Sequence, residues 1–216
     1  PLQSVLIRGS GVDLEAFPMR PVPVGPPLIV LPARMLRDKG VIEFAEAASL
    51  LRPRFPDARF ALVGGLDANR AAISETELRA LTKSGDVEWW GQRSDMGAVL
   101  AASTLVVLPS YREGVPKALL EAAATGRAIV TTDVPGCRHV VEDGVHGLLV
   151  PPKDAAALAN AIATLLDDPV KMSKMGAAAR HRADKEFSVH SVVEQTLAVY
   201  RALLNVSFNP ASGTQR

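Results

Sequence analysis

The chain has 216 residues, of which 48% are hydrophobic and 22% charged, enough for one α/β domain with a substantial core. Its 24 basic and 23 acidic residues give a net charge of +1, so the charge balance gives no reason to expect nucleic acid as a partner. The single cysteine, Cys137, excludes an internal disulfide and a cysteine-based zinc site, and no apolar run reaches membrane-spanning length.

Residues 1–27 are expected to be extended, because prolines recur from Pro18 to Pro27 and disfavour helix. The segment has neither a signal-peptide pattern nor an initiating methionine. We therefore interpret it as a linker from a missing N-terminal domain, in a piece cut from a longer protein.

From Leu28 onward, apolar runs alternate with helical patterns. The runs predict strands at Leu28–Ala33, Arg59–Gly64, Val87–Gly91, Thr104–Pro109, Ala128–Thr132 and Gly147–Val150. Helices are expected at Gly40–Leu51, Glu75–Lys83, Met96–Ala102, Lys117–Ala124, Arg138–Glu142 and Ala155–Leu166, with further helices to about Leu204. Residues 28–204 would then form the domain and residues 205–216 a tail.

The predicted strands are apolar throughout, as expected for strands covered on both faces. The alternation of strand and helix predicts an α/β, Rossmann-like fold with an about six-stranded parallel sheet and helices on both faces. Ligands of such sheets bind outside the carboxyl ends of the strands. This rule selects the loops that contain residues 33–40, 64–70, 91–95, 109–116 and 132–137.

The strongest functional signal is P-S-Y-R-E-G-V-P-K-A-L-L-E, residues 109–121. Glu113 lies in a ligand-side loop, and Glu121 follows on the next helix. Pro116 suits the first turn of that helix, which would place the amides of Gly114 and Val115 at or near a helix N-terminus, a natural seat for an anion. From the residues alone, the two glutamates equally fit a helix cap and a solvated helix position.

A second signal is the pair Arg34 and Lys39, in the loop after the first predicted strand. An arginine fork and a lysine point charge together suit a diphosphate. Basic pairs are also common on surfaces, and we assign Arg37 in the same loop to solvent.

The stretch 109–130 resembles the E-x7-E signature of the group 1 (fourth-family) retaining glycosyltransferases of the GT-B fold. The stretch V-P-G-C-R-H-V-V-E-D-G-V-H-G-L-L-V-P-P, residues 134–152, is similar to the same family, and the likeness extends from Arg8 to Leu204. The resemblance implies the C-terminal, donor-binding domain of such an enzyme, similar to those of bacterial surface-polysaccharide assembly.

By that resemblance Glu113 contacts the donor sugar and Glu121 the ribose, while Arg34 and Lys39 bind the diphosphate. Glu113, Arg34 and Lys39 are the expected catalytic residues. The donor site would also include a base contact from Arg93, the amides of Gly114 and Val115, and Gly64, whose sequence L-V-G-G fits close approach to a ligand or a simple turn.

Several other features receive minor roles. Val134, Pro135 and Gly136 are expected near the sugar. Trp89 and Trp90 are expected to point to opposite faces of a strand as core or interface residues rather than as stacking platforms. The helical pattern at Val192–Leu204 predicts a packing face, for this domain or for a missing partner domain.

No metal or other cofactor is expected, because the sequence has no D-x-D pair and its histidines lack ligand spacing with carboxylates. The expected donor is a nucleotide sugar, most simply a UDP-sugar. The expected acceptor is a saccharide or lipid-linked molecule of polysaccharide or lipopolysaccharide synthesis, held by the missing N-terminal domain. The whole enzyme would be cytoplasmic, with peripheral association at the inner face of the membrane, and this piece alone would be inactive. A nucleotide-sugar epimerase of the same fold and a non-catalytic nucleotide-sugar-binding module stay open as alternatives.

Overall fold

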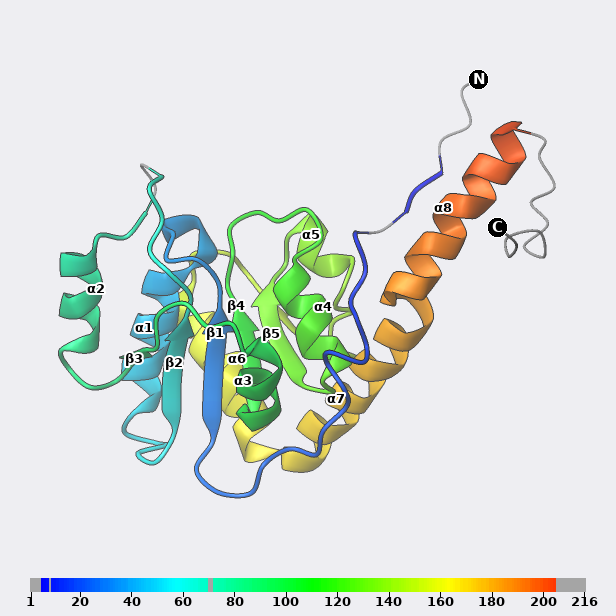
Figure 1. The fold of residues 1–216 in the computed structure, drawn as a ribbon. Helices are drawn as coiled ribbons and strands as arrows, with labels where there is room; N and C mark the ends of the chain where they lie inside the picture. The colour runs from blue at the N-terminus through cyan, green and yellow to red at the C-terminus, as the bar shows by residue number, and fades with distance from the viewer. Residues whose placement is uncertain (1–4, 8, 70–71, 205–216) are drawn as a thin grey trace.

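The structure, a computed structural model, describes residues 5–7, 9–69 and 72–204. It contains one sheet of six parallel strands in the order β3-β2-β1-β4-β5-β6. Figure 1 labels five of them, β1 to β5. The strands are β1 (Leu28–Pro32), β2 (Arg59–Val63), β3 (Glu88–Trp89), β4 (Leu105–Leu108), β5 (Ala128–Thr132) and β6 (Gly147–Val150). The predicted α/β, Rossmann-like fold is confirmed.

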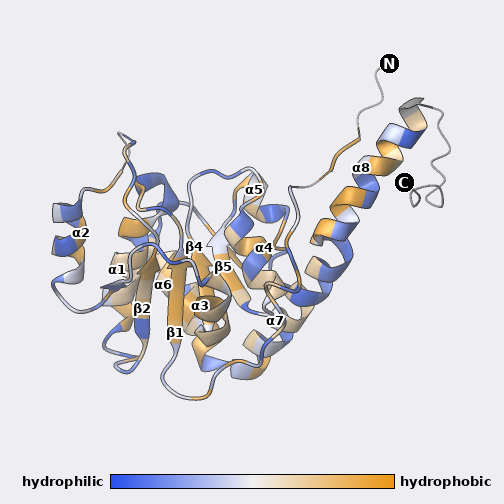
Figure 2. Ribbon diagram, viewed as in Figure 1, coloured by the Kyte–Doolittle hydropathy of each residue, from blue (hydrophilic) through white to orange (hydrophobic). Residues whose placement is uncertain are grey.

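Helices cover both faces of this sheet. Their bounds are α1 (Val41–Leu51), α2 (Glu75–Thr82), α3 (Met96–Ala102), α4 (Lys117–Ala124), α5 (Pro135–Arg138), α6 (Ala155–Asp167), α7 (Pro169–Arg182) and α8 (Val189–Leu204), with a 3-10 turn η1 (Arg37–Lys39) and a π-helix η2 (Ala183–Phe187). The sheet strands are the most hydrophobic part of the ribbon in Figure 2. The inner strands β1, β4 and β5 are buried at every position because each face meets a helical layer, whereas the edge strand β3 is short, half-buried and begins with Glu88.

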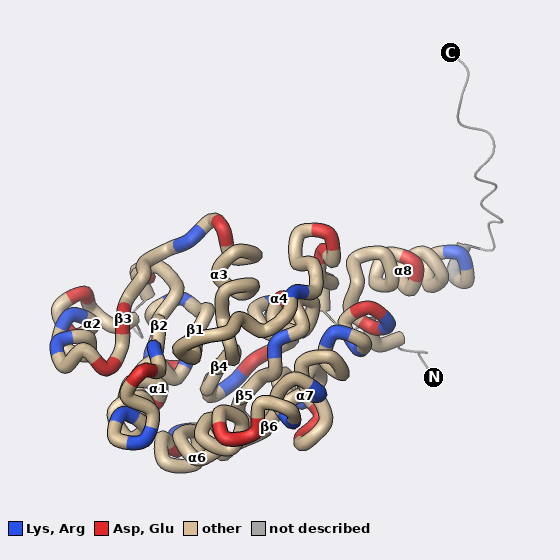
Figure 3. The backbone as a smooth tube through the Cα atoms, turned by 90° about the horizontal axis from the view of Figure 1, so that it is seen from below, with Lys and Arg blue, Asp and Glu red and all other residues tan. Residues whose placement is uncertain are grey.

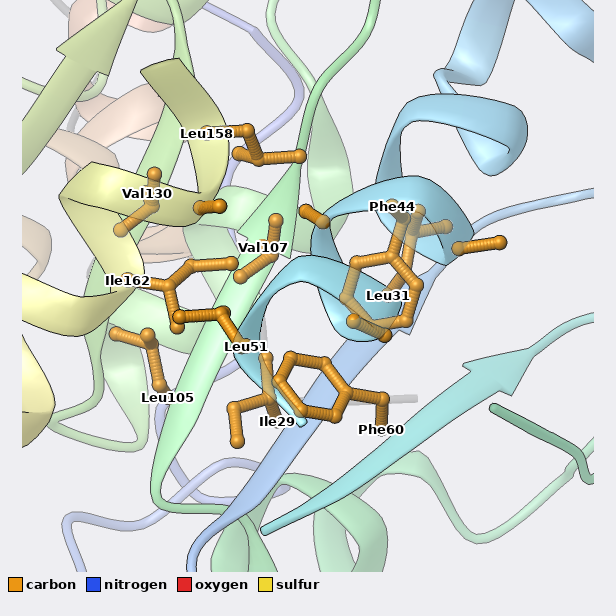
Figure 4. Packing of buried hydrophobic residues seen from close by; sticks show 14 of the residues in the cluster. Ile29, Leu31, Phe44, Leu51, Phe60, Leu105, Val107, Val130, Leu158 and Ile162 are labelled. Atoms are coloured by element: carbon orange, nitrogen blue, oxygen red, sulfur yellow. The ribbon is translucent and has the colours of Figure 1, made fainter. Parts of the chain in front are cut away.

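Strand β1 shows how the two layers are divided. Ile29 and Leu31 belong to one buried cluster, with residues of α1 and α6, while Leu28 and Val30 belong to a second cluster with residues of α3 and α4. Successive side chains of a strand point to opposite faces. Figure 4 shows the first cluster, in which Phe44 of α1 packs edge-to-face against Phe60 of β2 with ring centroids 5.7 Å apart.

Part of the predicted linker packs on the domain. Val12 is buried, its N–H donates to the Phe187 carbonyl at 2.7 Å, and its carbonyl accepts from Val189 at 3.1 Å. The fully buried Arg127 donates to the Pro21 carbonyl at 3.0 Å. The described residues that precede Val12 leave the domain on the same side as α8 (Figure 1). The division of the chain at residue 27 stays a prediction, and residues 205–216 lie outside the described part of the chain.

Two local predictions are wrong. The helix expected at Arg138–Glu142 is a single turn that begins earlier, at Pro135, because proline suits the first helical position and Val134 before it is extended. Pro116 lies outside the first turn of α4: it is the N-cap, with extended backbone, and the helix begins at Lys117.

The strand order places a topological switch between β1 and β4. From β1 the chain runs outward through β2 and β3, and β4 then returns to the other side of β1. The loops after β1 and β4 therefore diverge and leave a crevice at the carboxyl edge of the sheet, the usual ligand position in this architecture. Viewed from the opposite edge of the sheet, acidic and basic residues are interspersed along the backbone (Figure 3).

Candidate functional site

Lys39 and Glu113, one residue from each of the two sequence signals, contact each other at this switch point. Lys39, at the end of the η1 turn after β1, places its Nζ 2.6 Å from Oε1 of Glu113, in the loop after β4. The side chains are only 20% and 11% exposed, so the ion pair is largely shielded from water. The sequence placed both residues in ligand-side loops but gave no sign that they pair.

A cleft of about 290 Å³ opens at the same edge of the sheet. It gathers Arg34 from the loop after β1, Gly64 from the loop after β2, Arg93 from the loop after β3, and Glu121 from α4. Four predicted donor-site residues from four separate parts of the chain thus line one space. Four further lining residues fall in the ligand-side loops that the sequence selected: Ala33, Gly65, Leu66 and Gln92. The others, outside those loops, are Pro32, Val63, Met96 and Ala118.

Glu121 is the acidic wall of this cleft. Its side chain is 13% exposed, and Lys117, one helical turn earlier, approaches it at 3.7 Å. Burial raises the pKa of Glu121, and the nearby Lys117 opposes that rise. A carboxylate that is poorly hydrated and only weakly paired is well prepared to accept hydrogen bonds from vicinal hydroxyls.

Both arginines of the cleft already have carboxylate partners. Arg34 donates to Asp67 at 2.5 Å, and Arg93 donates twice to Asp95, at 2.8 and 2.6 Å. The pKa of Asp67 is lowered, chiefly because the Asn69 N–H donates to it and also by Arg34. These acidic partners were missed, because acidic residues in exposed loops carry no sequence signal of their own. Arg37, assigned to solvent, is exposed and pairs with Glu77 of α2.

The loop that contains Glu113 is held from behind by α5. A Cβ on Gly136 would lie 2.0 Å from the Gly114 carbonyl oxygen and 2.3 Å from that of Glu113, so only glycine allows this approach. Gly114 is exposed, and Val115 packs against the second buried cluster. Both lie just before α4 rather than inside its first turn.

The tryptophans support the site instead of lining it. Trp89 packs on the first buried cluster and Trp90 on the second, which confirms the prediction of opposite faces. The indole N–H of Trp89 donates to the Gly64 carbonyl at 2.9 Å. Gly64 lies so close to β1 that a Cβ would be 1.8 Å from the Ala33 carbonyl oxygen, which fixes the floor of the cleft.

A larger hollow of about 720 Å³ lies elsewhere, between α1, α2 and the start of α6. Its lining is mainly Ala, Leu and Ile, with Glu46 as its one charged residue. We place the site at the smaller cleft, because cationic and anionic side chains from several loops converge there, at the topological switch point.

Within residues 5–7, 9–69 and 72–204, no group of three or more His, Cys, Asp and Glu side chains is placed to hold a metal ion. No helix in that part of the chain is long and apolar enough to cross a bilayer.

Comparisons with known proteins bear on the family and the fold. A family model described as glycosyl transferases group 1 matches residues 26–168. The N,N'-diacetylbacillosaminyl-diphospho-undecaprenol alpha-1,3-N-acetylgalactosaminyltransferase of Campylobacter jejuni is 41% identical over 142 residues, which are 66% of this chain and 36% of that protein. The alpha-maltose-1-phosphate synthase of Mycobacterium tuberculosis is 34% identical, over 89% of this chain and 55% of that protein.

A solved structure of similar shape is sucrose-phosphate synthase from Thermosynechococcus elongatus, with a TM-score of 0.78 and 30% identity over 91% of this chain and 52% of that one. HepE of Anabaena, solved in complex with UDP, has a TM-score of 0.78 at 22% identity, over 89% of this chain and 56% of that one, and shows the fold alone. The chain spans between about a third and about half of the curated relatives' length.

Proposed function

The chain belongs to the group 1 glycosyl transferases, and from this premise we propose that its carboxyl-edge cleft binds the nucleotide-sugar donor for retaining glycosyl transfer. The observation that carries the proposal is the meeting, at the β1–β4 switch point, of the Lys39–Glu113 pair and the cleft that contains Arg34 and Glu121. Unlike the mainly apolar hollow between α1, α2 and α6, this cleft combines cations with a shielded carboxylate.

Each side chain has a part in the proposed site. Glu121 accepts from the ribose hydroxyls, and Gly64 and Arg93 border the base. Arg34 and Lys39 face the diphosphate, together with the amides of Gly114 and Val115, which lie just before the start of α4. Glu113 holds the sugar.

The proposed chemistry is electrostatic. When the bond between the sugar and the diphosphate breaks, negative charge grows on the leaving phosphate, and preorganised cations stabilise it with little rearrangement. Arg34 and Lys39 supply that charge, so the proposal includes no metal and no other cofactor. Glu113 orients the sugar. The acceptor attacks the anomeric carbon of the sugar from the face that the leaving phosphate occupies, which accounts for retention of the anomeric configuration.

For the donor we propose a UDP-sugar, because HepE, which shares the fold, was solved with UDP. For the acceptor we propose a saccharide or lipid-linked molecule, because the name of the Campylobacter relative specifies a diphospho-undecaprenol acceptor. Polysaccharide or lipopolysaccharide synthesis in the cytoplasm, at the inner face of the membrane, fits such an acceptor.

An acceptor domain is the proposed partner of this chain within a longer enzyme. Val193 and Leu197 lie one turn apart on α8 and are 46% and 37% exposed, an apolar face that a second domain would cover. Alignment of donor and acceptor supplies about 7–11 kcal/mol of barrier lowering, so donor binding alone does not produce transfer.

The test compares residues 1–216 with the longer enzyme, each given a UDP-sugar with and without acceptor. We expect the chain to bind UDP without transferring sugar, and the longer enzyme to transfer it with retention. Conversion of the sugar to its epimer without acceptor would favour the epimerase, and binding by the longer enzyme without any turnover would favour the binding module. Turnover by residues 1–216 equal to that of the longer enzyme would contradict the division of labour.

A further inference from the structure

Tyr111 stands between the two loops that hold the Lys39–Glu113 pair. It precedes Glu113 by two residues, and its main-chain N–H donates to the Asp38 carbonyl at 2.8 Å. Its hydroxyl donates to Oε1 of Glu43, in the first turn of α1, at 2.5 Å. One residue of the β4 loop is thus bonded on both sides of Lys39, through its main chain and through its side chain.

These bonds matter because the sheet does not set the spacing of the two loops. The pairing of β1 with β4 ends at Val30 and Val106, before either strand ends. On their outer sides, by contrast, β1 pairs with β2 as far as Pro32, and β4 pairs with β5 as far as Leu108. The two loops therefore separate where the crevice opens, and contacts beyond the sheet must fix the distance between them.

The contact between the loops is tight. A Cβ on Gly40 would lie 2.3 Å from the Pro109 carbonyl oxygen, so the backbone of the β1 loop lies directly against that of the β4 loop. Lys153, after β6, places its Nζ 4.8 Å from the centre of the Tyr111 ring, which adds a cation–π contact from a third ligand-side loop.

The hydrogen bond to Glu43 is part-buried and charge-assisted. Glu43 is 9% exposed, and its other oxygen, Oε2, is buried with no hydrogen-bond partner among the described residues. The Tyr111 hydroxyl therefore stabilises a carboxylate that is poorly solvated. Burial, and next the bond to Glu43, raise the pKa of Tyr111 to about 12, so the hydroxyl keeps its proton and donates at neutral pH.

We propose that Tyr111, bonded to Glu43, is a positioning residue that sets the distance between Lys39 and Glu113. The inference rests on the proposed function, in which Lys39 faces the diphosphate while Glu113 holds the sugar of the same donor. Both groups contact one rigid ligand only if their loops keep a fixed separation, and a loose separation costs affinity because ordering must accompany binding.

The test uses Tyr111→Phe, which removes only the hydroxyl, with Tyr200→Phe as the matched control. Tyr200 is the second of the chain's two tyrosines and is 58% exposed on α8. Affinity for UDP-glucose is measured by calorimetry and, for weak variants, by NMR titration. We expect Tyr111→Phe to bind about three- to tenfold more weakly, the net effect of one hydrogen bond, and Tyr200→Phe to bind as the unsubstituted chain does.

Two more comparisons separate positioning from a general effect on the fold. Glu43→Gln keeps an acceptor oxygen and should retain most of the affinity, whereas Glu43→Ala should lose as much as Tyr111→Phe. In a Glu113→Gln background the loss caused by Tyr111→Phe should shrink below about twofold, because the pair that Tyr111 positions is already gone. Equal losses in both backgrounds, or no loss in either, would overturn the inference.

A measurement without ligand keeps the inference distinct from the proposed function. Amide hydrogen exchange of the free chain should rise at residues 37–43 and 109–115 in Tyr111→Phe and not in Tyr200→Phe. Unchanged exchange in those loops would refute the positioning role whatever the donor is. Failure of the unsubstituted chain to bind any nucleotide sugar would instead contradict the proposed function.

Discussion

Replacing Lys39 by methionine removes one charge from the centre of the proposed site while it keeps most of the side-chain volume. In the proposed complex Lys39 donates to the diphosphate, a charge-assisted hydrogen bond worth about 1.5–3 kcal/mol. In the free chain the same ammonium is bonded to Glu113 at 2.6 Å, so part of that energy is already present before UDP binds. We therefore expect the lower end of the range, a loss of about tenfold in UDP affinity.

The same substitution also affects folding. Without Lys39, the Glu113 carboxylate, 11% exposed, has lost its cation, which costs about 1–3 kcal/mol. For a chain of this length each kcal/mol lowers Tm by about 2–4 °C, so Tm should fall by roughly 2–12 °C. In the double variant Lys39→Met/Glu113→Gln the neutral amide no longer needs a cation, so most of the lost stability should return while UDP affinity stays low.

Calorimetry with UDP and a thermal melt of the same samples separate the two effects. Arg37→Met is the matched control, because Arg37 lies in the same turn but is exposed and paired with Glu77; its UDP affinity should change by less than about twofold. An unchanged UDP affinity in Lys39→Met would refute the placement of Lys39 at the diphosphate. A double variant that regained both stability and affinity would show that the loss came from the fold.

Four further outcomes follow from the same structure. Glu121→Gln should raise the Tm of the free chain at pH 7 while it weakens UDP binding, because the pKa of Glu121 is raised on folding and its ionised form therefore opposes folding above that pKa. The gain in Tm should vanish near pH 4, below the ordinary carboxyl pKa of about 4.3. No gain in Tm at pH 7 would contradict this. Arg127→Ala leaves backbone carbonyls without their donor, so the free energy of unfolding measured in urea should fall by about 3 kcal/mol or more. The control Arg59→Ala, at a half-exposed arginine, should lower it by less than about 1 kcal/mol. UDP affinity should be the same in EDTA and in Mg²⁺, and a strict metal requirement would refute the metal-free proposal. Gly136→Ala should displace the loop that contains Glu113, because its Cβ would lie 2.0 Å from the Gly114 carbonyl oxygen. The substitution should therefore weaken UDP-glucose binding more than UDP binding, and equal losses would oppose a role of this loop at the sugar.

The strands were predictable because their sequence signal is physical and local. A strand covered on both faces reads as a continuous apolar run, as in Leu28–Pro32 and Leu105–Leu108. The short helix after β5 was misplaced because a single turn has no periodicity to read. There Pro135 was the better guide, since it suits the first position of a helix.

The position of the candidate site residues at one edge of the sheet was predictable, whereas their pairings were not. The loop rule and the family resemblance placed Arg34, Lys39, Glu113 and Glu121 at one edge of the sheet. The contact between Lys39 and Glu113 depends on β4 lying beside β1, which is a property of the strand order. Contacts such as Tyr111 with Glu43 join residues 68 positions apart, and neither residue alone indicates the other.

The central claim is that UDP occupies the cleft at the carboxyl edge of the sheet, and an NMR titration of residues 1–216 with UDP tests it most directly. The account predicts that the amide signals of Gly64, Gly65 and Gln92, together with those of the Glu113 loop, shift with one common saturation curve. It also predicts that the amide signals of the residues that line the hollow between α1, α2 and α6 do not shift. Shifts confined to the residues of that hollow, or no saturable shift at all, would contradict it.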